Sequence, residues 1–346
     1  MKIDMKINRI YIWLTLIGTL FVSCENQDIE FPDYDYQTVY FGSQYYVRTI
    51  ELGEDLYVDN TIDNEHKIKI KAAMGGVYSN KKDRVIDFIV DESLCNNLYF
   101  AGGGKIIPMP SSYYKLASNQ IIIPSGAESG GVEVEFTDAF FADPKSLVAT
   151  YVIPLVMTNV NSGDSILRGK PQVVNPNRCI KDDWTIAPKD FVLCAVKYVN
   201  PWHANYLRRG VDQITTTGVV STNVRHKEYV ENDEEVNITT GSLTKCTLPL
   251  SIKDSNGHTV DYDLLITFAD DGTCNVSGNS DSYEISGSGK FVSKGEKNSI
   301  GGKDCDALYL DYNVNFKNLN TQYTTKDTLV VKNRGIVPEY FTVETK

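Results

Sequence analysis

The fold is decided most clearly by residues 248–268, which run LPLSIKDSNGHTVDYDLLITF. Apolar and polar side chains alternate along the first arm, where Leu248, Leu250 and Ile252 share one face. The returning arm repeats the alternation with Val260, Tyr262, Leu264, Ile266 and Phe268. Between the arms, residues 254–257 (DSNG) have the composition of a tight turn. Because successive side chains of a strand point to opposite faces, this stretch predicts a hairpin with one buried face.

Downstream, the same alternation continues and predicts a closed sheet. Residues 270–272 (DDG) turn the chain again, and a later strand places Leu308, Leu310, Tyr312, Val314 and Phe316 on one face. A sheet of about eight up-and-down strands removes its exposed edges by closing on itself. We therefore expect an antiparallel, lipocalin-like β-barrel over residues 189–346, opening with the apolar strand at residues 191–199.

Upstream, shorter strands predict a different β domain. Runs rich in Val, Ile, Tyr and Phe occur at residues 67–72, 85–90, 121–123, 132–136 and 149–157. Their spacing favours a small antiparallel sandwich of immunoglobulin-like shape over residues 37–160. Residues 161–188 are rich in Asn, Gly and Pro, so we interpret them as a linker. The predicted fold class is all-β, with the sandwich followed by the barrel.

The N-terminus has the pattern of an export signal. Lys2, Lys6 and Arg9 precede residues 10–22, which carry no charge. As a helix this apolar stretch reaches only about 20 Å, too short for a comfortable membrane span. Residues 20–24 (LFVSC) resemble the lipobox of bacterial lipoproteins. We therefore predict a signal peptide over residues 1–23, with Cys24 as the lipid anchor that attaches the chain to a membrane.

Residues 24–36 are predicted to form a tether. Their acidic run at residues 25–30 (ENQDIE) resembles the surface-export signal of Bacteroidota lipoproteins, and a plain solvated tether is the alternative. We expect a lipid-anchored outer-membrane protein, on the cell surface if the export signal is read.

The charge balance excludes one class of partner. The chain has 45 acidic and 34 basic residues, a formal net charge of −11. Nucleic acid gains affinity by counterion release to Lys and Arg, so an acidic chain of this kind predicts no nucleic-acid partner. The remaining cysteines lack the CxxC spacing of a zinc ribbon, and we expect buried free thiols, with one or two disulfides as the alternative. These cysteines are Cys95, Cys179, Cys194, Cys246, Cys274 and Cys305.

Several short motifs carry a resemblance to a known family. They are residues 113–116 (YYKL), 121–126 (IIIPSG) and 149–155 (ATYVIPL) in the first half, and 196–203 (VKYVNPWH), 206–210 (YLRRG), 301–302 (GG) and 308–312 (LYLDY) in the second. Together they resemble a Bacteroidota family of two-domain surface lipoproteins without an assigned biochemical function. That family is similar to accessory glycan-binding lipoproteins of Sus-type polysaccharide-utilisation loci. The resemblance implies a polysaccharide ligand and an outer-membrane importer complex as a partner.

The candidate ligand site is the segment at residues 202–210 (WHANYLRRG), which we expect in a loop. A sugar ring offers an apolar face and a rim of hydroxyls, so its site needs a flat aromatic ring beside polar side chains. The candidate residues are Trp202, His203, Tyr206, Arg208 and Arg209. The structural alternative is that the two aromatics close the end of the barrel while an arginine pairs with a carboxylate. Weaker candidates are Tyr45, Tyr46, Tyr113, Tyr114 and Trp184.

Catalytic and metal-binding patterns are absent from the sequence. The four histidines are scattered without a second ligand at metal-site spacing, and no Gly-x-Ser-x-Gly elbow occurs. We expect no cofactor, no metal and no enzyme activity. The hypothesis is a non-enzymatic surface lipoprotein that binds polysaccharide for uptake. The alternatives are a structural or adhesive protein with a protein partner, and a carrier holding a small apolar ligand inside the barrel.

Overall fold

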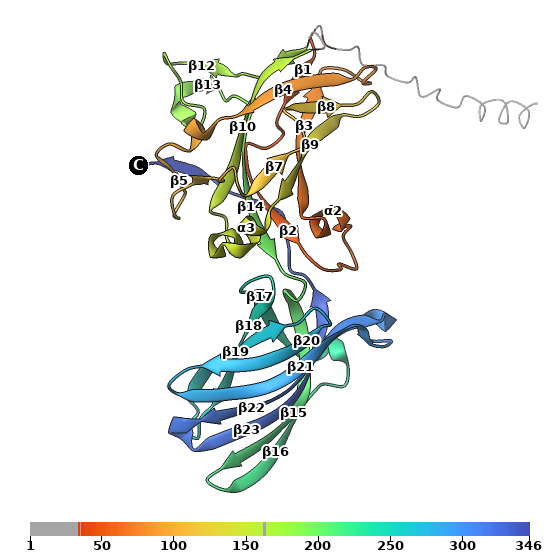
Figure 1. The fold of residues 1–346 in the computed structure, drawn as a ribbon, viewed down its shortest axis with the longest axis vertical. Coiled ribbons are helices and arrows are strands. Elements are labelled where there is room, and N and C mark those ends of the chain that lie inside the picture. Colours follow the sequence, from red (N-terminus) through yellow and green to blue (C-terminus); the bar gives the residue numbers. More distant parts are fainter. Residues whose placement is uncertain (1–33, 35, 162–163) are drawn as a thin grey trace, which may run out of the picture.

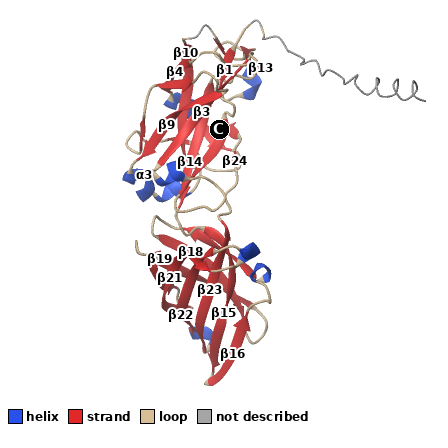
Figure 2. Cartoon of the chain, turned by 90° about the vertical axis from the view of Figure 1, so that its right-hand side faces the viewer, coloured by secondary structure: helices blue, strands red, loops and turns tan. Residues whose placement is uncertain are grey.

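The computed structural model describes residues 34, 36–161 and 164–346, and strands dominate it. A two-sheet sandwich and a closed barrel lie end to end along the long axis of the molecule (Figures 1 and 2). The predicted all-β class is confirmed. The predicted signal peptide and Cys24 lie outside the described residues. Within the described part of the chain, no helix is both long enough and apolar enough to cross a membrane.

The sandwich consists of a five-stranded and a seven-stranded sheet. The smaller sheet has the order β11 (Ser165–Ile166), β1 (Thr38–Tyr40), β3 (Lys67–Gly75), β9 (Ser129–Phe136) and β7 (Tyr114–Leu116). The larger has the order β24 (Glu339–Tyr340), β2 (Tyr45–Glu51), β14 (Phe191–Val199), β10 (Tyr151–Val160), β4 (Arg84–Val90) and β8 (Gln120–Ile123), with β6 (Ile107–Pro108) beside β10. Most pairs are antiparallel, as the sequence predicts, but β2–β14, β1–β11 and β6–β10 are parallel.

Smaller elements complete the sandwich. Two short ribbons pair β12 (Lys170–Pro171) with β13 (Trp184–Ile186), and β5 (Leu98–Phe100) with β25 (Val343–Thr345). The helices are α2 (Thr61–Asn64) and α3 (Asp138–Ala142). Single 3₁₀ turns occur at η1 (Glu92–Cys95), η2 (Pro144–Leu147) and η3 (Lys181–Asp183), and in the barrel at η4 (Val230–Asn232), η5 (Ile300–Gly302) and η6 (Lys317–Leu319).

Strand β14 belongs to the sandwich and not to the barrel, where its sequence had predicted it. It pairs with β10 along one edge and with β2 along the other. Val192 and Cys194 face the core between the two sheets, whereas Phe191 and Leu193 face a second apolar cluster on the outer side. A central strand that is buried on both faces is apolar at every position, so its sequence does not show on which side of a boundary it lies.

The predicted linker at residues 161–188 is also part of the sandwich. Within it, β11 pairs with β1, and β12 and β13 pair with each other. The C-terminus returns from the barrel as well: β24 pairs with β2 and β25 with β5. The barrel is therefore inserted between β14 and β24, and two chain segments connect it to the sandwich.

The barrel closes as an antiparallel ring of eight strands. Its strands are β15 (Ala204–Thr216), β17 (Glu234–Thr240), β18 (Lys245–Lys253), β19 (Thr259–Phe268), β20 (Thr273–Asn279), β21 (Tyr283–Glu296), β22 (Cys305–Phe316) and β23 (Thr321–Asn333). The long β15 closes the ring by pairing with β23, and its second half also carries the hairpin strand β16 (Val219–Arg225). The predicted hairpin is confirmed, because Leu250 pairs with Tyr262 and Ile252 with Val260 across β18 and β19.

Candidate functional site

The predicted site at residues 202–210 is mostly strand rather than loop, because β15 begins at Ala204. The half-buried Trp202 ring stacks on Phe268 with a centroid separation of 3.9 Å and an interplanar angle of 5°. Tyr206 is fully buried, and its hydroxyl donates to the Trp202 carbonyl at 2.8 Å. Both aromatic side chains pack on the core at the end of the barrel that faces the sandwich. This matches the alternative interpretation given above, in which the two aromatics close the end of the barrel.

Each polar side chain of this segment that was predicted to bind ligand has a partner within the protein, although one nitrogen of Arg209, Nη2, is buried without a hydrogen bond. His203 Nδ1 accepts from the Thr240 amide at 3.2 Å, and burial together with Arg334 lowers the pKa of His203 to about 4. Arg208 is buried and donates from Nε to Asp327 at 2.9 Å. Arg209 Nε donates to Asp233 at 2.6 Å. The five predicted residues lie close together, but their contacts stabilise the barrel.

The barrel interior is packed with side chains. Tyr206, Tyr312 and Phe316 are among its large buried residues, together with Leu248, Leu250, Leu264, Ile266, Leu308, Leu310, Val314 and Leu329. A carrier of a small apolar ligand needs an open interior of several hundred cubic ångströms. The packing therefore argues against the carrier alternative.

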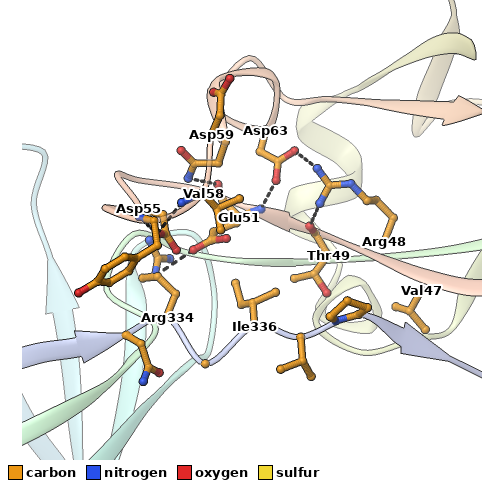
Figure 3. A pocket seen from close by; sticks show the side chains of 16 residues that line it. Val47, Arg48, Thr49, Glu51, Asp55, Val58, Asp59, Asp63, Arg334 and Ile336 are labelled. Carbon is orange, nitrogen blue, oxygen red and sulfur yellow. Dashed lines mark hydrogen bonds and ion pairs between the residues drawn. The ribbon is translucent and has the colours of Figure 1, made fainter. Parts of the chain in front are cut away.

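A cleft lies where the sandwich meets the chain that leaves the barrel (Figure 3). One wall comes from the end of β2, the loop at residues 52–60 and α2, and the other from residues 333–338. Its volume is about 660 Å³, within the usual range for ligand sites. We call it the interdomain cleft.

Arg334 and Glu51 form the floor of the interdomain cleft. The buried Arg334 donates to four main-chain carbonyls, those of Leu52, Glu54, Asn200 and His203, at 2.7–3.2 Å. These bonds fasten the sandwich to both segments that enter and leave the barrel. Glu51 Oε1 lies 3.5 Å from Arg334 Nε, but it is buried and accepts no hydrogen bond.

The carboxyl groups of the cleft differ in their surroundings. Burial raises the pKa of Glu51 to about 7; Arg334 opposes this shift, and Asp55 and Asp63 add to it. Asp63 accepts from the Glu51 amide at 2.9 Å and pairs with Arg48. Burial nevertheless raises the pKa of Asp63, against the effect of these two donors. The floor of the cleft is therefore a place where negative charge is poorly solvated.

The mouth of the cleft presents an aromatic ring. Tyr57 is 65% exposed and follows Asp55, whose Oδ1 accepts from the amides of Tyr57 and Val58 at 2.6 and 3.1 Å. Lys303 of the barrel lies 5.5 Å from the centroid of the Tyr57 ring. The carboxylate turn thus holds a flat ring beside polar side chains. This site was not predicted from the sequence, where the only local signal is an aromatic residue among the acids of residues 51–60 (ELGEDLYVDN).

The weaker aromatic candidates fall into two groups. Tyr45 and Trp184 line a smaller cavity of about 290 Å³ beside Arg178 and Lys181. Trp184 Nε1 donates to the Asn177 carbonyl at 2.8 Å, which fixes its ring. The others, Tyr46, Tyr113 and Tyr114, pack against the core of the sandwich. The small cavity combines an aromatic wall with cations, but it has less than half the volume of the interdomain cleft.

Metal and thiol chemistry find no support in the described residues. Across residues 34, 36–161 and 164–346, no three His, Cys, Asp or Glu side chains gather as metal ligands would. The six cysteines named above are buried free thiols, as the sequence analysis favours. Burial raises the pKa of five of them, Cys95, Cys179, Cys194, Cys246 and Cys274, which keeps these thiols protonated at neutral pH.

Two family models match separate parts of the chain. A domain of unknown function, DUF5627, matches residues 201–335, which span the barrel. A family of N-terminal domains, described as a "-like, N-terminal domain", matches residues 34–164 of the sandwich. No protein of curated function matches the chain.

A solved structure is similar over nearly the whole chain. It is a Bacteroides ovatus protein of unknown function, 55% identical, with a TM-score of 0.85; the match covers 90% of this chain and 100% of that one. Another Bacteroides ovatus protein of unknown function is 15% identical, with a TM-score of 0.42 and coverages of 87% and 97%. A candidate carbohydrate binding protein from Bacteroides ovatus ATCC 8483 is 12% identical, with a TM-score of 0.27 and coverages of 89% and 97%. Only the first likeness is close enough to carry an argument.

Proposed function

We propose that this chain binds glycan at the outer membrane in a non-enzymatic role. The chain belongs to a Bacteroides family of two-domain proteins of unknown function. The observation that carries the proposal is the interdomain cleft, with the exposed Tyr57 ring beside a floor of carboxyl groups. Carboxylates accept hydrogen bonds from sugar hydroxyls, and an aromatic face packs against the C–H face of a sugar ring. The cleft supplies both.

The location is proposed from the N-terminal sequence. Lipid on Cys24 attaches the protein to the outer membrane, and residues 24–36 hold the folded part away from the bilayer. A glycan bound in the cleft is then presented to an importer complex in the same membrane. Replacing Cys24 by Ser is expected to move the native protein from the membrane fraction to the soluble fraction. Recovery of the variant in the membrane fraction would contradict a lipid anchor at this residue.

The glycan proposal is tested with soluble protein comprising residues 25–346. We expect a member of a broad glycan panel to bind, and Tyr57→Ala to weaken its binding about tenfold, the effect of losing one good aromatic contact. Tyr36→Ala is the matched control, because Tyr36 is 68% exposed and lies next to β1, outside the lining of the cleft. Isothermal titration calorimetry measures both.

The outcomes separate the site from the function. Equal loss in the two tyrosine variants, or loss in neither, would place the glycan elsewhere than the cleft. Loss of binding in Trp202→Ala with an intact near-ultraviolet circular dichroism spectrum would restore residues 202–210 as the site. Failure of every glycan in the panel to bind would overturn the proposed function.

One observation favours the second candidate function, adhesion to a protein partner. Strand β16 pairs with β15 and with no other strand in the described part of the chain. Three of its side chains, Val219, Val220 and Val224, are more than half exposed. An exposed, β-branched edge strand is a template for pairing with another chain. Replacing Val220 and Val224 by Lys puts charges on this edge but keeps Arg225, so it should block such pairing and leave glycan binding in the cleft unchanged.

A further inference from the structure

We infer that the exposed edge of β16 pairs with the same edge of a second copy of this chain, so that two barrels join across a two-fold axis at Thr222. The inference goes beyond the proposed function and does not depend on the glycan site. Three features of β16 carry it: its edge is long and uncovered, it lacks the protection that the other sheet edges have, and its side chains match those of an antiparallel copy.

Strand β16 is uncovered along its outer edge. It pairs with β15 in a register without a bulge, and with no other strand in the described part of the chain. The turn before it has positive φ at Thr217 (49°) and Gly218 (85°), as in the type I′ turns that suit a regular hairpin. Residues 219–224 are all exposed, and the strand lies at the end of the barrel farthest from the sandwich (Figure 1). A second chain can therefore reach this edge without displacing another part of the protein.

The other strands at sheet edges are short or charged. In the sandwich, β11 and β24 have two residues each, and β7 has three with Lys115 at its centre. β8 has four residues. Short edge strands and lysines protect sheets against pairing with another chain. β16 has seven residues, and residues 219–224 include no charge and no proline. Its edge therefore lacks the protection that the sandwich edges have.

The side chains of β16 match those of a second, antiparallel β16. When Thr222 lies on the two-fold axis it faces its own copy, and Val220 faces Val224 on the same side of the sheet. Directly opposite β-branched side chains of this kind stabilise a strand pair. On the other side of the sheet, Ser221 faces Asn223, so that two polar side chains meet. A shift of two residues in either direction would remove both valine pairs.

The same register brings no like charges together. Arg225 is the charged residue of β16, and it faces Val219 of the second copy. Its guanidinium is paired with carboxylates of its own barrel. The next residues, His226 and Lys227, come opposite the neutral turn at residues 217–218. Like charges directly opposite would destabilise the pair, so this register has no such cost.

The net charge of the chain gives the pairing a characteristic salt dependence. The formal net charge is −11, so two copies repel each other at low ionic strength. Salt screens this repulsion, with a screening length of about 10 Å at ~0.1 M. The contacts at the β16 edge are between neutral groups and are not weakened by salt. Dimerisation should therefore become tighter as salt is added, whereas an interface held by ion pairs would become weaker.

The first test measures the mass of soluble protein comprising residues 25–346. Analytical ultracentrifugation at micromolar concentrations is expected to show a reversible dimer that is tighter at ~0.5 M than at ~0.05 M salt. The double variant Val220→Lys and Val224→Lys should weaken dimerisation about tenfold or more, because lysines then face each other across the axis. The matched control is Val148→Lys with Val174→Lys, which adds the same charge at residues that are 59% and 91% exposed in the sandwich.

A cysteine on the two-fold axis tests the register. Residues directly opposite in an antiparallel pair have Cα atoms about 4.5–5.5 Å apart, which is within reach of a disulfide. Thr222→Cys should therefore form a disulfide-linked dimer under mild oxidation. Ser221→Cys is the control, because it is displaced by two positions from its own copy and lies beyond that reach. The native cysteines among the described residues are buried and should not interfere.

The results separate this inference from the glycan proposal. A protein that stays monomeric at every concentration and salt would overturn the pairing. A dimer that persists in the double-lysine variant, or that is lost equally in the Val148 and Val174 control, would place the interface away from β16. Cross-linking of Ser221→Cys as efficient as that of Thr222→Cys would contradict the register. Glycan binding is measured on the same proteins, and its absence beside an intact dimer would count against the proposed function alone.

Discussion

The barrel and the interdomain cleft both contain buried arginines beside carboxyl groups, but the hydrogen bonds between these groups differ in the two regions. In the barrel, Asp327 accepts from Arg208 and from the Tyr312 hydroxyl at Oδ2, both at 2.9 Å, and from Arg225 at Oδ1 at 2.5 Å. In the cleft, Arg334 gives its hydrogen bonds to the main chain, and the carboxylate beside it keeps an unbonded oxygen.

The difference separates side chains that specify the fold from side chains that are free to act. A buried charge whose bonds are all made within the protein has nothing left to offer a ligand, and its removal damages the structure. A buried carboxylate oxygen that lacks a hydrogen-bond donor destabilises the protein. Trp202, Tyr206 and Arg208 belong with the first kind, and Glu51 with the second.

The largest effect expected from this comparison is on the stability of the barrel. Asp327→Asn removes the charge that pairs with Arg208 and Arg225, so both guanidinium groups lose a buried counterion. Breaking a buried pair from one side typically costs 3–5 kcal/mol, and we expect about 3 kcal/mol here because Asp212 still pairs with Arg225. Urea unfolding followed by tryptophan fluorescence measures the change.

The control is Asp311→Asn on the outer face of β22. Asp311 is 57% exposed and pairs with Lys326 at 3.2 Å. An exposed pair of this kind contributes about 0.5 kcal/mol. If the two variants lose similar stability, the barrel network is not the structural element that its geometry indicates.

A smaller effect is expected at the predicted sugar-binding aromatic. Trp202→Ala removes the ring stacked on Phe268 and should destabilise the protein by about 2 kcal/mol, less than for a fully buried tryptophan because the ring is half-buried. Glycan affinity should not change. Trp202→Phe keeps an aromatic face and should recover about half of the lost stability. A variant of wild-type stability would show that the stack does not hold the end of the barrel.

Local pattern was enough to predict the fold class and much of the barrel. The period of two in residues 248–268 fixed which face of β18 and β19 is buried, and the turn at residues 254–257 fixed their register. Local pattern was not enough to predict the order of strands in the sandwich. Strand β14 has no alternation to interpret, and the pairing of β24 with β2 joins residues almost 300 positions apart.

The candidate site failed to emerge from the sequence for a related reason. The identity of an aromatic or arginine residue does not show whether its side chain faces solvent or a barrel interior. Residues 202–210 were therefore predicted to be a binding loop. One signal was available: Tyr206 and Arg208 are two positions apart and so share a face of β15, which points to the buried side. The interdomain cleft gave no comparable signal, because Glu51 and Arg334 meet only through the return of the chain from the barrel.

The smallest expected effect is on the pH dependence of stability, and it tests the cleft half of the comparison. The pKa of Glu51 is raised to about 7 in the folded protein, above its value of about 4.3 in an unfolded chain. A raised carboxyl pKa contributes stability below the unfolded value, and that contribution is lost as the pH rises through 7. Glu51→Gln removes this dependence but also takes a counterion from Arg334. We therefore expect the variant to gain about 1 kcal/mol over the wild type between ~pH 6 and ~pH 7, measured by urea unfolding at each pH. A difference that stays constant across this range, or that favours the wild type at the higher pH, would show that the Glu51 carboxylate is satisfied after all, and the cleft would then resemble the barrel network.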